Sequence, residues 1–154
     1  MKPLVRRTHG YTLIELLTVA VLLAILAAIA LPMFRDTVHN ARAANILGDV
    51  RVVQIAYSNL LADNPTWTRN GGWGRVPPDL APYLPEGFNF QTEMAVYRWV
   101  RLRPRASPWG VGSAMLWVRP VRNLRPRLVD KLARMANQTM IIKRRNDVRF
   151  YMVP

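Results

Sequence analysis

LLTVAVLLAILAAIALPMF, residues 16–34, is a run of 19 residues without a charged side chain. As an α-helix the run would be roughly 28 Å long, close to the ~30 Å hydrocarbon core of a lipid bilayer. In a chain of 154 residues, a small soluble core rarely has room to surround such a helix on every side. We therefore predict that this segment is a membrane-spanning helix.

The residues before this run give the helix an orientation. Lys2, Arg6 and Arg7 precede it without any acidic residue, so residues 1–10 should stay on the cytoplasmic side and the C-terminus should lie outside. Glu15 conflicts with a plain anchor, because a carboxylate near the bilayer core is costly and usually has a specific partner. By itself, Glu15 could equally well reach the headgroup region.

The sequence Gly10-Tyr11-Thr12-Leu13-Ile14-Glu15 resembles the processing site of type IV prepilins and pseudopilins. That family has a short basic leader, a Gly, an aromatic residue and a Glu as the fifth residue of the mature chain. Pro32 matches the proline that these helices commonly carry. Tyr11 is a departure, since Phe is the commoner first mature residue, but it keeps the aromatic ring. The resemblance covers roughly residues 2–36.

The resemblance implies a processing pathway and an assembly role. A prepilin peptidase would cut after Gly10 and N-methylate the new amine of Tyr11, and Glu15 of one subunit would neutralise the Tyr11 ammonium of a neighbour. Other pilin or pseudopilin subunits and the bacterial inner membrane would be the partners. The implied segments are a basic leader (1–10), a transmembrane and filament-core helix (11–34), an amphipathic helix (35–63) and a periplasmic globular head (64–154).

A second cleavage site competes with the first. Ala28-Ile29-Ala30 has the small-x-small form that ordinary signal peptidase recognises, and its use would release a soluble chain that begins at Leu31. Glu15 and the length of the apolar run disfavour this alternative. The mass of the mature chain distinguishes loss of residues 1–10 from loss of residues 1–30.

Beyond Pro32 the uniformly apolar pattern becomes periodic, which predicts a helix with one buried face that ends at Asn64-Pro65. The complete helix would run from Tyr11 to Ala62, with Pro32 able to kink it or melt a turn. His39 is expected to be a solvated helix residue. The predicted buried face consists of Phe34, Val38, Ala41, Leu47, Val50, Val53, Tyr57, Leu60 and Leu61.

The remainder predicts an α+β head. Four apolar runs indicate strands: Glu93–Leu102, whose alternation is not clean, Ser113–Val121, Thr139–Lys143 and Val148–Val153. Residues 144–147 form a plausible hairpin turn, residues 126–137 a short helix, and residues 79–85 at most one helical turn. We expect an antiparallel sheet of about four strands on the C-terminal half of the long helix, as in a type IV pilin-like fold.

Composition excludes several kinds of site. The chain has no Cys and only two His, His9 and His39, so a thiolate or multi-histidine metal centre is excluded. We predict no metal, no cofactor and no enzymatic activity, because the sequence has no nucleophile elbow, paired carboxylates or acidic calcium loop. The scattered acids are Asp79, Glu86, Glu93, Asp130 and Asp147, and the expected core aromatics are Trp99, Trp109, Trp117, Phe150 and Tyr151.

The chain is strongly basic, with 22 Lys and Arg against 9 Asp and Glu. Arg interleaved with Trp is typical of proteins that grip a phosphate backbone or single-stranded bases. A genome that favours Arg codons, or contact with acidic neighbours in a filament, explains the composition equally well. The candidate nucleic-acid contacts are Arg98, Arg101, Arg103, Arg105, Arg119 and Arg122.

Two functions therefore follow from the sequence. The first is a structural subunit, processed after Gly10 and assembled through its N-terminal helix into a type II secretion pseudopilus or a type IV pilus. The alternative is a DNA-binding minor pilin that serves DNA uptake through its Arg-rich head. The assembly signal is common to secretion, motility and uptake, so it does not choose between them.

Overall fold

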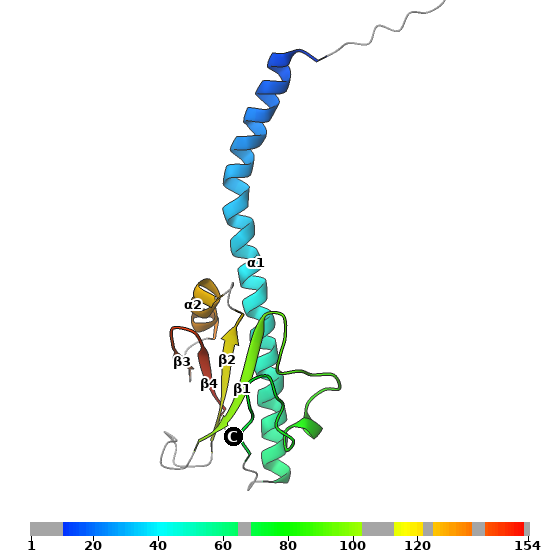
Figure 1. Cartoon of the computed structure of the whole chain (residues 1–154), viewed down its shortest axis with the longest axis vertical. Helices are drawn as coiled ribbons and strands as arrows, with labels where there is room; N and C mark the ends of the chain where they lie inside the picture. Colours follow the sequence, from blue (N-terminus) through cyan, green and yellow to red (C-terminus); the bar gives the residue numbers. More distant parts are fainter. Residues whose placement is uncertain (1–10, 65–68, 103–112, 122–124, 137–140, 153–154) are drawn as a thin grey trace, which may run out of the picture. The chain divides into compact units, whose positions relative to one another are not determined.

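The computed structural model describes residues 11–64, 69–102, 113–121, 125–136 and 141–152. The elements in chain order are α1 (Leu13–Asp63), the 3₁₀ turn η1 (Ala81–Tyr83), β1 (Ala95–Arg101), β2 (Ala114–Pro120), α2 (Arg125–Met135), β3 (Ile141–Lys143) and β4 (Val148–Met152) (Figure 1). The chain divides into two compact units, one that ends at Val38 and one from His39 to Pro154. The unit boundary therefore falls within α1.

Helix α1 confirms the predicted long helix to within two residues at each end. It continues through Pro32 without interruption, so the melted turn that the sequence allowed does not occur. All side chains from Tyr11 to Phe34 are exposed. Within the described part of the chain, α1 is the one helix that is long and apolar enough to cross a membrane.

The second part of α1 packs on the sheet, but its buried face differs from the predicted one. Phe34 is 67% exposed and Ala41 is also exposed, whereas Val38 and Leu47 are half-buried. The predicted face combined residues from two different sides of the helix. Only the side formed by the later residues contacts the sheet. The residues that α1 buries are Ala43, Ile46, Val50, Val53, Ala56, Tyr57 and Leu60, at the spacing of three and four that one helix face requires.

The four strands form one antiparallel sheet in the order β1-β2-β4-β3. Their bounds lie within two residues of the predicted ones, although residues 139–140 and 153 lie outside the described part. The turn between β3 and β4 is the predicted one, and in it Arg144 N donates to Asp147 O at 2.9 Å. Helix α2 and η1 also fall where the sequence placed a short helix and a single helical turn.

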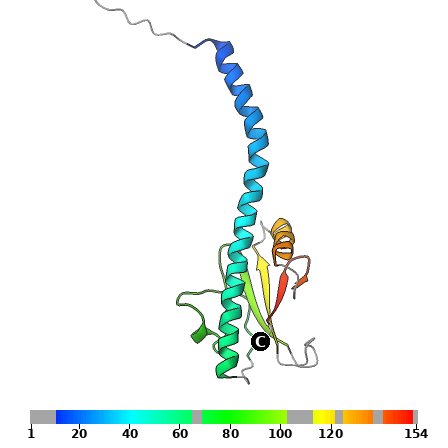
Figure 2. The same cartoon turned by 180° about the vertical axis from the view of Figure 1, so that it is seen from behind.

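Figures 1 and 2 show the second part of α1 against one face of the sheet. The burial pattern of the strands shows that alternate residues lie in the core with α1. In β1 these residues are Ala95, Tyr97 and Trp99, all fully buried. The alternation in β1 is therefore clean, and only the apolar outward residues Val96 and Val100 obscured it in the sequence. Strands β2 and β4 contribute Ala114, Leu116, Val118, Val148, Phe150 and Met152 to the same core.

Two of the predicted core aromatics lie on the other face. Trp117 and Tyr151 are half-buried, because their neighbours Leu116 and Phe150 take the inward positions and side chains alternate along a strand. Trp99 and Phe150 are in the core as expected. Trp109 lies outside the described residues.

Polar groups also tie the sheet to α1. Tyr97 Oη donates a 2.5 Å hydrogen bond to Asp49 Oδ2 of α1. Burial and, second, this hydrogen bond raise the pKa of the Tyr97 phenol far above its usual range. The protonated phenol is the donor in this pair.

His39 departs from its predicted environment. The side chain is half-buried rather than solvated, and Nδ1 is enclosed without a hydrogen-bond partner among the described residues. His39 is the first residue of the second compact unit, so its partial burial reflects the point where α1 begins to pack on the head.

Candidate functional site

The first candidate site is the N-terminus of α1, which Thr12 and Glu15 cap together. Glu15 N donates to Thr12 Oγ1 at 3.3 Å, and Glu15 Oε2 accepts from Thr12 N at 2.8 Å and from Thr12 Oγ1 at 2.8 Å. This reciprocal arrangement is a capping box, which satisfies two backbone donors that a helix start otherwise leaves open. Within a single subunit, Glu15 thus already has partners.

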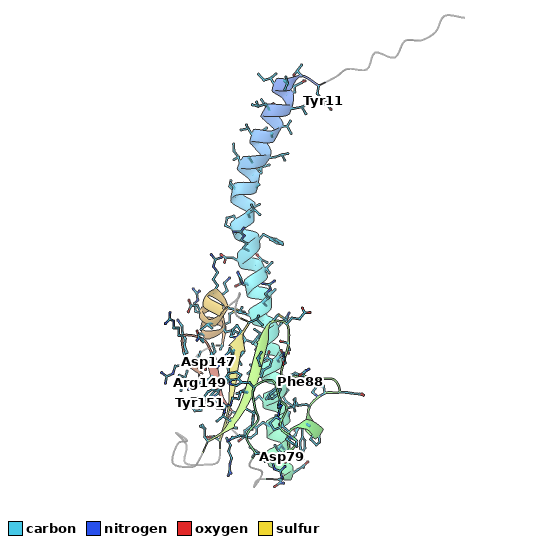
Figure 3. The ribbon with its side chains drawn as sticks, in the orientation of Figure 1. Tyr11, Asp79, Phe88, Asp147, Arg149 and Tyr151 are labelled. Carbon is cyan, nitrogen blue, oxygen red and sulfur yellow. The ribbon has the colours of Figure 1, made fainter. Side chains whose placement is uncertain are left out.

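The other predicted processing residues are only partly placed. Gly10 lies outside the described residues, and Tyr11 is 82% exposed at the start of α1 (Figure 3). Pro32 lies inside α1. The segment that carries these residues presents apolar side chains on all sides, among which Glu15 is the single acidic residue between Tyr11 and Phe34.

The second candidate site is a row of alternating arginine and tryptophan side chains on the face of the sheet opposite to α1. We define the Arg–Trp row as Arg119, Trp73, Arg98, Trp117 and Arg149. Three of these are direct neighbours across strands, since Arg98 of β1 pairs with Trp117 of β2, and Trp117 pairs with Arg149 of β4. The sheet register therefore brings together residues that are far apart in the sequence.

Stacking distances define the row. The Arg119 guanidinium carbon lies 3.8 Å from the Trp73 ring centroid, and that of Arg149 lies 3.8 Å from the Trp117 centroid. Arg98 is between the two indoles, 5.9 Å from Trp73 and 5.3 Å from Trp117. The indoles meet edge to face at 6.2 Å. Each contact is in the range of a cation–π interaction, so the rings hold the three guanidiniums in place.

A loop places Trp73 over this face. Gly71 N donates to Trp99 O at 3.0 Å and Gly74 N donates to Tyr97 O at 2.8 Å, which fastens the loop along the edge of β1. Gly74 has a φ of +70°, in the left-handed region that side chains disfavour. The Gly-rich segment thus has a structural role, since its turn delivers the indole to the row.

The row has fewer acceptors than donors. Arg149 Nε donates to Asp147 Oδ2 at 2.9 Å, and Figure 3 shows both residues on β4 and its preceding turn. Arg98 Nε and Arg119 Nε are enclosed and have no hydrogen-bond partner among the described residues. One carboxylate therefore faces three guanidiniums.

The structure brings together two of the six predicted nucleic-acid contacts, Arg98 and Arg119. Arg101 lies at the end of β1 and is exposed, and its backbone N donates to Asn70 Oδ1 at 2.6 Å. Arg103, Arg105 and Arg122 lie outside the described residues. The prediction missed Arg149 and the two indoles, although alternation in the predicted strand 148–153 would have put Arg149 on the face opposite to Phe150.

The acidic residues of the head show no metal-binding arrangement. Asp130 Oδ1 lies 2.6 Å from Lys143 Nζ, and this ammonium holds the pKa of Asp130 below its usual range. Asp147 pairs with Arg149, as described above. In the residues that the structure covers, no three His, Cys, Asp or Glu side chains are grouped so that they could hold a metal ion.

Residues 5–31 match the family described as the prokaryotic N-terminal methylation motif. The chain is 32% identical over 66 residues to a probable minor fimbrial protein of Dichelobacter nodosus. The aligned stretch is 43% of this chain and 42% of the relative. It is 44% identical over 52 residues to the type IV narrow pilus major component PilA5 of Thermus thermophilus. This aligned stretch is 34% of this chain and 45% of the relative.

The chain thus matches less than half the length of these curated relatives, and no solved structure matches it. The fold adds independent support, because a long N-terminal helix packed on a small antiparallel sheet is consistent with a type IV pilin. The methylation motif, the relatives and the α+β fold together make this chain type IV pilin-like.

Proposed function

We propose that this chain is a structural pilin-like subunit that a prepilin peptidase cuts after Gly10 and N-methylates at Tyr11. The mature chain is a single-pass inner-membrane protein with a periplasmic head, and it assembles with other pilin or pseudopilin subunits through α1. The resulting filament is a type IV pilus or a type II secretion pseudopilus. The observation that supports this best is the exposed apolar part of α1 with Glu15 at its start.

Water is a poor solvent for the apolar part of α1. Leu16, Leu22, Leu26 and Ile29 are each more than half exposed, and such a helix is unstable in water unless lipid or other helices cover it. Lipid covers it before assembly, and the equivalent helices of neighbouring subunits cover it afterwards. Both surroundings are apolar, so the transfer between them costs little hydrophobic free energy.

Glu15 gives this exchange a preferred register. In an apolar bundle an unpaired carboxylate is costly, and an ammonium close to it is strongly attractive. The N-terminal amine that cleavage creates on Tyr11 of a neighbour supplies that ammonium. Since Thr12 already caps Glu15 within the subunit, assembly adds the ammonium to this arrangement or replaces the Thr12 hydroxyl with it.

The mass of the mature chain tests the processing step. The full chain is expressed with and without a prepilin peptidase, and its intact mass is measured. We expect loss of residues 1–10 and gain of one methyl group only when the peptidase is present. Gly10→Val should remain uncut, because a branched side chain blocks access to the scissile bond. Loss of residues 1–30 would show that the site at Ala28–Ala30 is used and would overturn the proposal.

The Arg–Trp row favours a second function, that of a DNA-binding minor pilin in DNA uptake. Processing leaves 19 basic and 9 acidic residues, a net charge of +10, and a patch of guanidiniums with few carboxylates attracts phosphate. Retention of the mature chain by double-stranded DNA, with a steep loss as salt is added, tests this function. Absence of retention at low salt would exclude it and leave the structural role unaffected.

A further inference from the structure

We propose that the Arg–Trp row binds the phosphodiester backbone of nucleic acid through its guanidinium groups, without stacking on the bases. This inference rests on the DNA-binding function proposed above and assigns it a surface and a mode of contact. Of the six arginines expected from the sequence it keeps Arg98 and Arg119, to which it adds Arg149, and it gives Trp73 and Trp117 a positioning role.

Each indole already has a guanidinium stacked 3.8 Å from its ring centroid. Two guanidiniums lie within 6 Å of each ring centroid, and the two rings also meet edge to face. A nucleobase needs an open aromatic face to stack, and here arginines occupy that position. Single-stranded bases were one of the two ligands that the sequence suggested, and the geometry disfavours them.

The same stacking prepares the guanidiniums for oxyanions. A guanidinium has five N–H donors in a planar fork that fits phosphate in a bidentate manner. Stacking on an indole uses the flat face of the group and leaves the N–H edge free to donate. Arg149 Nε donates to Asp147, and the Nε atoms of Arg98 and Arg119 are buried, so the terminal Nη groups of the three arginines are the donors that remain for a phosphate.

Among the described residues, Asp147 is the one carboxylate paired with a guanidinium of the row. Three further carboxylates have partners elsewhere: Asp49 accepts from Tyr97, Asp63 accepts from Tyr83, and Asp130 pairs with Lys143. Further copies of the same chain, each with an excess of basic residues, would add repulsion. A partner with regularly repeated anions fits better.

Sheet geometry favours a chain of phosphates over a single anion. Arg98 and Arg149 are separated by one strand, which places their backbones roughly 10 Å apart, and Arg119 is displaced from this line by two residues along β2, roughly 7 Å. A polyanion engages all three groups at once, which raises its affinity over that of separate anions. Duplex and single strand share this backbone, so both should bind.

The test measures binding of the mature full chain, held in detergent micelles, to three fluorescent probes of equal length. The probes are a DNA duplex, a single strand, and a strand in which every base is replaced by an abasic site. We expect the single strand and its abasic counterpart to bind with affinities within about threefold of each other. Loss of about tenfold or more for the abasic strand would show base stacking and overturn the assignment, with DNA binding itself retained.

Variants of equal charge locate the site. The triple variant Arg98→Gln, Arg119→Gln, Arg149→Gln should lower duplex affinity by about tenfold or more and reduce the salt slope by about three. The matched control changes Arg35, Arg51 and Arg134 to Gln, three arginines on α1 and α2, and should lower it by less than about threefold. Equal losses in both triples would mean attraction by net charge alone, and the assignment of the row would be wrong.

Two controls keep the outcomes distinct. Circular dichroism checks that each variant is folded. If the Gln variant unfolds, the triple Arg→Lys variant provides the test, because it keeps the charge but loses the planar fork. An affinity equal to that of the wild type would then contradict the proposal. Displacement of the abasic strand by polyglutamate at equal charge would show an acidic protein as the partner instead. If no probe binds at low salt, the assignment of the row and the DNA-binding function are both wrong. The processing experiment still tests the structural role.

Discussion

Thr12 and Glu15 form a capping box at the start of α1. The capping box shows that the carboxylate has a local use even in a single subunit, since it satisfies Thr12 N at 2.8 Å. If Glu15 pairs with an ammonium during assembly, that pair must stabilise the carboxylate by more than the capping interaction does. A helix N-cap typically contributes about 1 kcal/mol. A pair with an ammonium in an apolar surrounding meets that condition.

The first prediction concerns Glu15→Ala. Processing after Gly10 should remain largely intact, because the scissile bond is five residues away, whereas incorporation into filaments should fall by about tenfold or more, since a charge pair in an apolar bundle is lost. Intact mass measures the first step, and the yield of sheared filaments measures the second. Thr12→Val is the matched control, because it removes the hydroxyl of the capping box and keeps the carboxylate. Normal assembly of Glu15→Ala would contradict the pairing role.

Tyr97 carries the second prediction. Tyr97→Phe should lower the free energy of unfolding by about 1–3 kcal/mol, because Asp49 loses its donor. The control is Tyr83→Phe, which removes an exposed hydrogen bond of the same chemistry, Tyr83 Oη to Asp63 Oδ2 at 2.9 Å, and should cost less than about 0.5 kcal/mol. Urea titration of both variants measures the difference. Equal losses of unfolding free energy would show that the buried pair contributes no more to stability than the exposed one.

The raised pKa of Tyr97 also gives stability a pH dependence. Below about pH 10 the phenol is protonated in both the folded and unfolded chain. Above about pH 10 the unfolded chain loses this proton first, so the free energy of unfolding falls as pH rises toward the folded pKa. Tyr97→Phe should reduce this alkaline slope without abolishing it, because burial also raises the pKa of Tyr57.

At the scale of elements, α1 has two kinds of surface on one helix. Up to Phe34 every described side chain is exposed, and from Ala43 one face is buried against the sheet. The helix is continuous across both parts. The exposure of its side chains changes because the sheet packs against the second part. The sequence differs in the same way, because residues 16–34 are without a charged side chain and the later part has charged residues on the faces that do not contact the sheet.

The third prediction compares two isoleucines of α1. Ile46 is fully buried and Ile55 is 63% exposed. Ile46→Ala should lower the free energy of unfolding by about 2–5 kcal/mol through lost burial and a cavity, whereas Ile55→Ala should change it by less than about 0.5 kcal/mol. Urea denaturation measures both. A large effect of Ile55→Ala would show that the buried face of α1 is assigned in the wrong phase.

At the scale of the whole molecule, the head depends on α1. Seven residues of α1 between Ala43 and Leu60 are buried in the core together with the sheet. The compact unit accordingly begins at His39, within the helix. A sheet without this helix would expose its whole apolar face to water.

The fourth prediction follows from this dependence. A chain of residues 39–154 should fold cooperatively in water, because it keeps the whole core. A chain of residues 64–154 should fail to fold or should aggregate, since Tyr97, Trp99 and Leu116 lose the helix that buries them. Circular dichroism with thermal melting distinguishes the two chains. Cooperative melting of the shorter chain would contradict the role given to α1.

Local patterns in the sequence determined much of this protein. An uninterrupted apolar run and a helical period set the long helix, and alternating apolar runs set the four strands, because both periods are properties of the backbone alone. Residues 10–15 also indicated the methylation motif that the comparison then matched. These features depend on neighbours within a few positions.

Tertiary structure decided what depends on distant partners. The phase of the buried face of α1, the outward position of Trp117 and the meeting of Trp73 with Arg98, Arg119 and Arg149 all follow from register and packing. An arginine has the same local propensity on either face of a strand, so its sequence context cannot show which residues it contacts. The pairing of strands assembles the Arg–Trp row, because each strand supplies only one or two of its members.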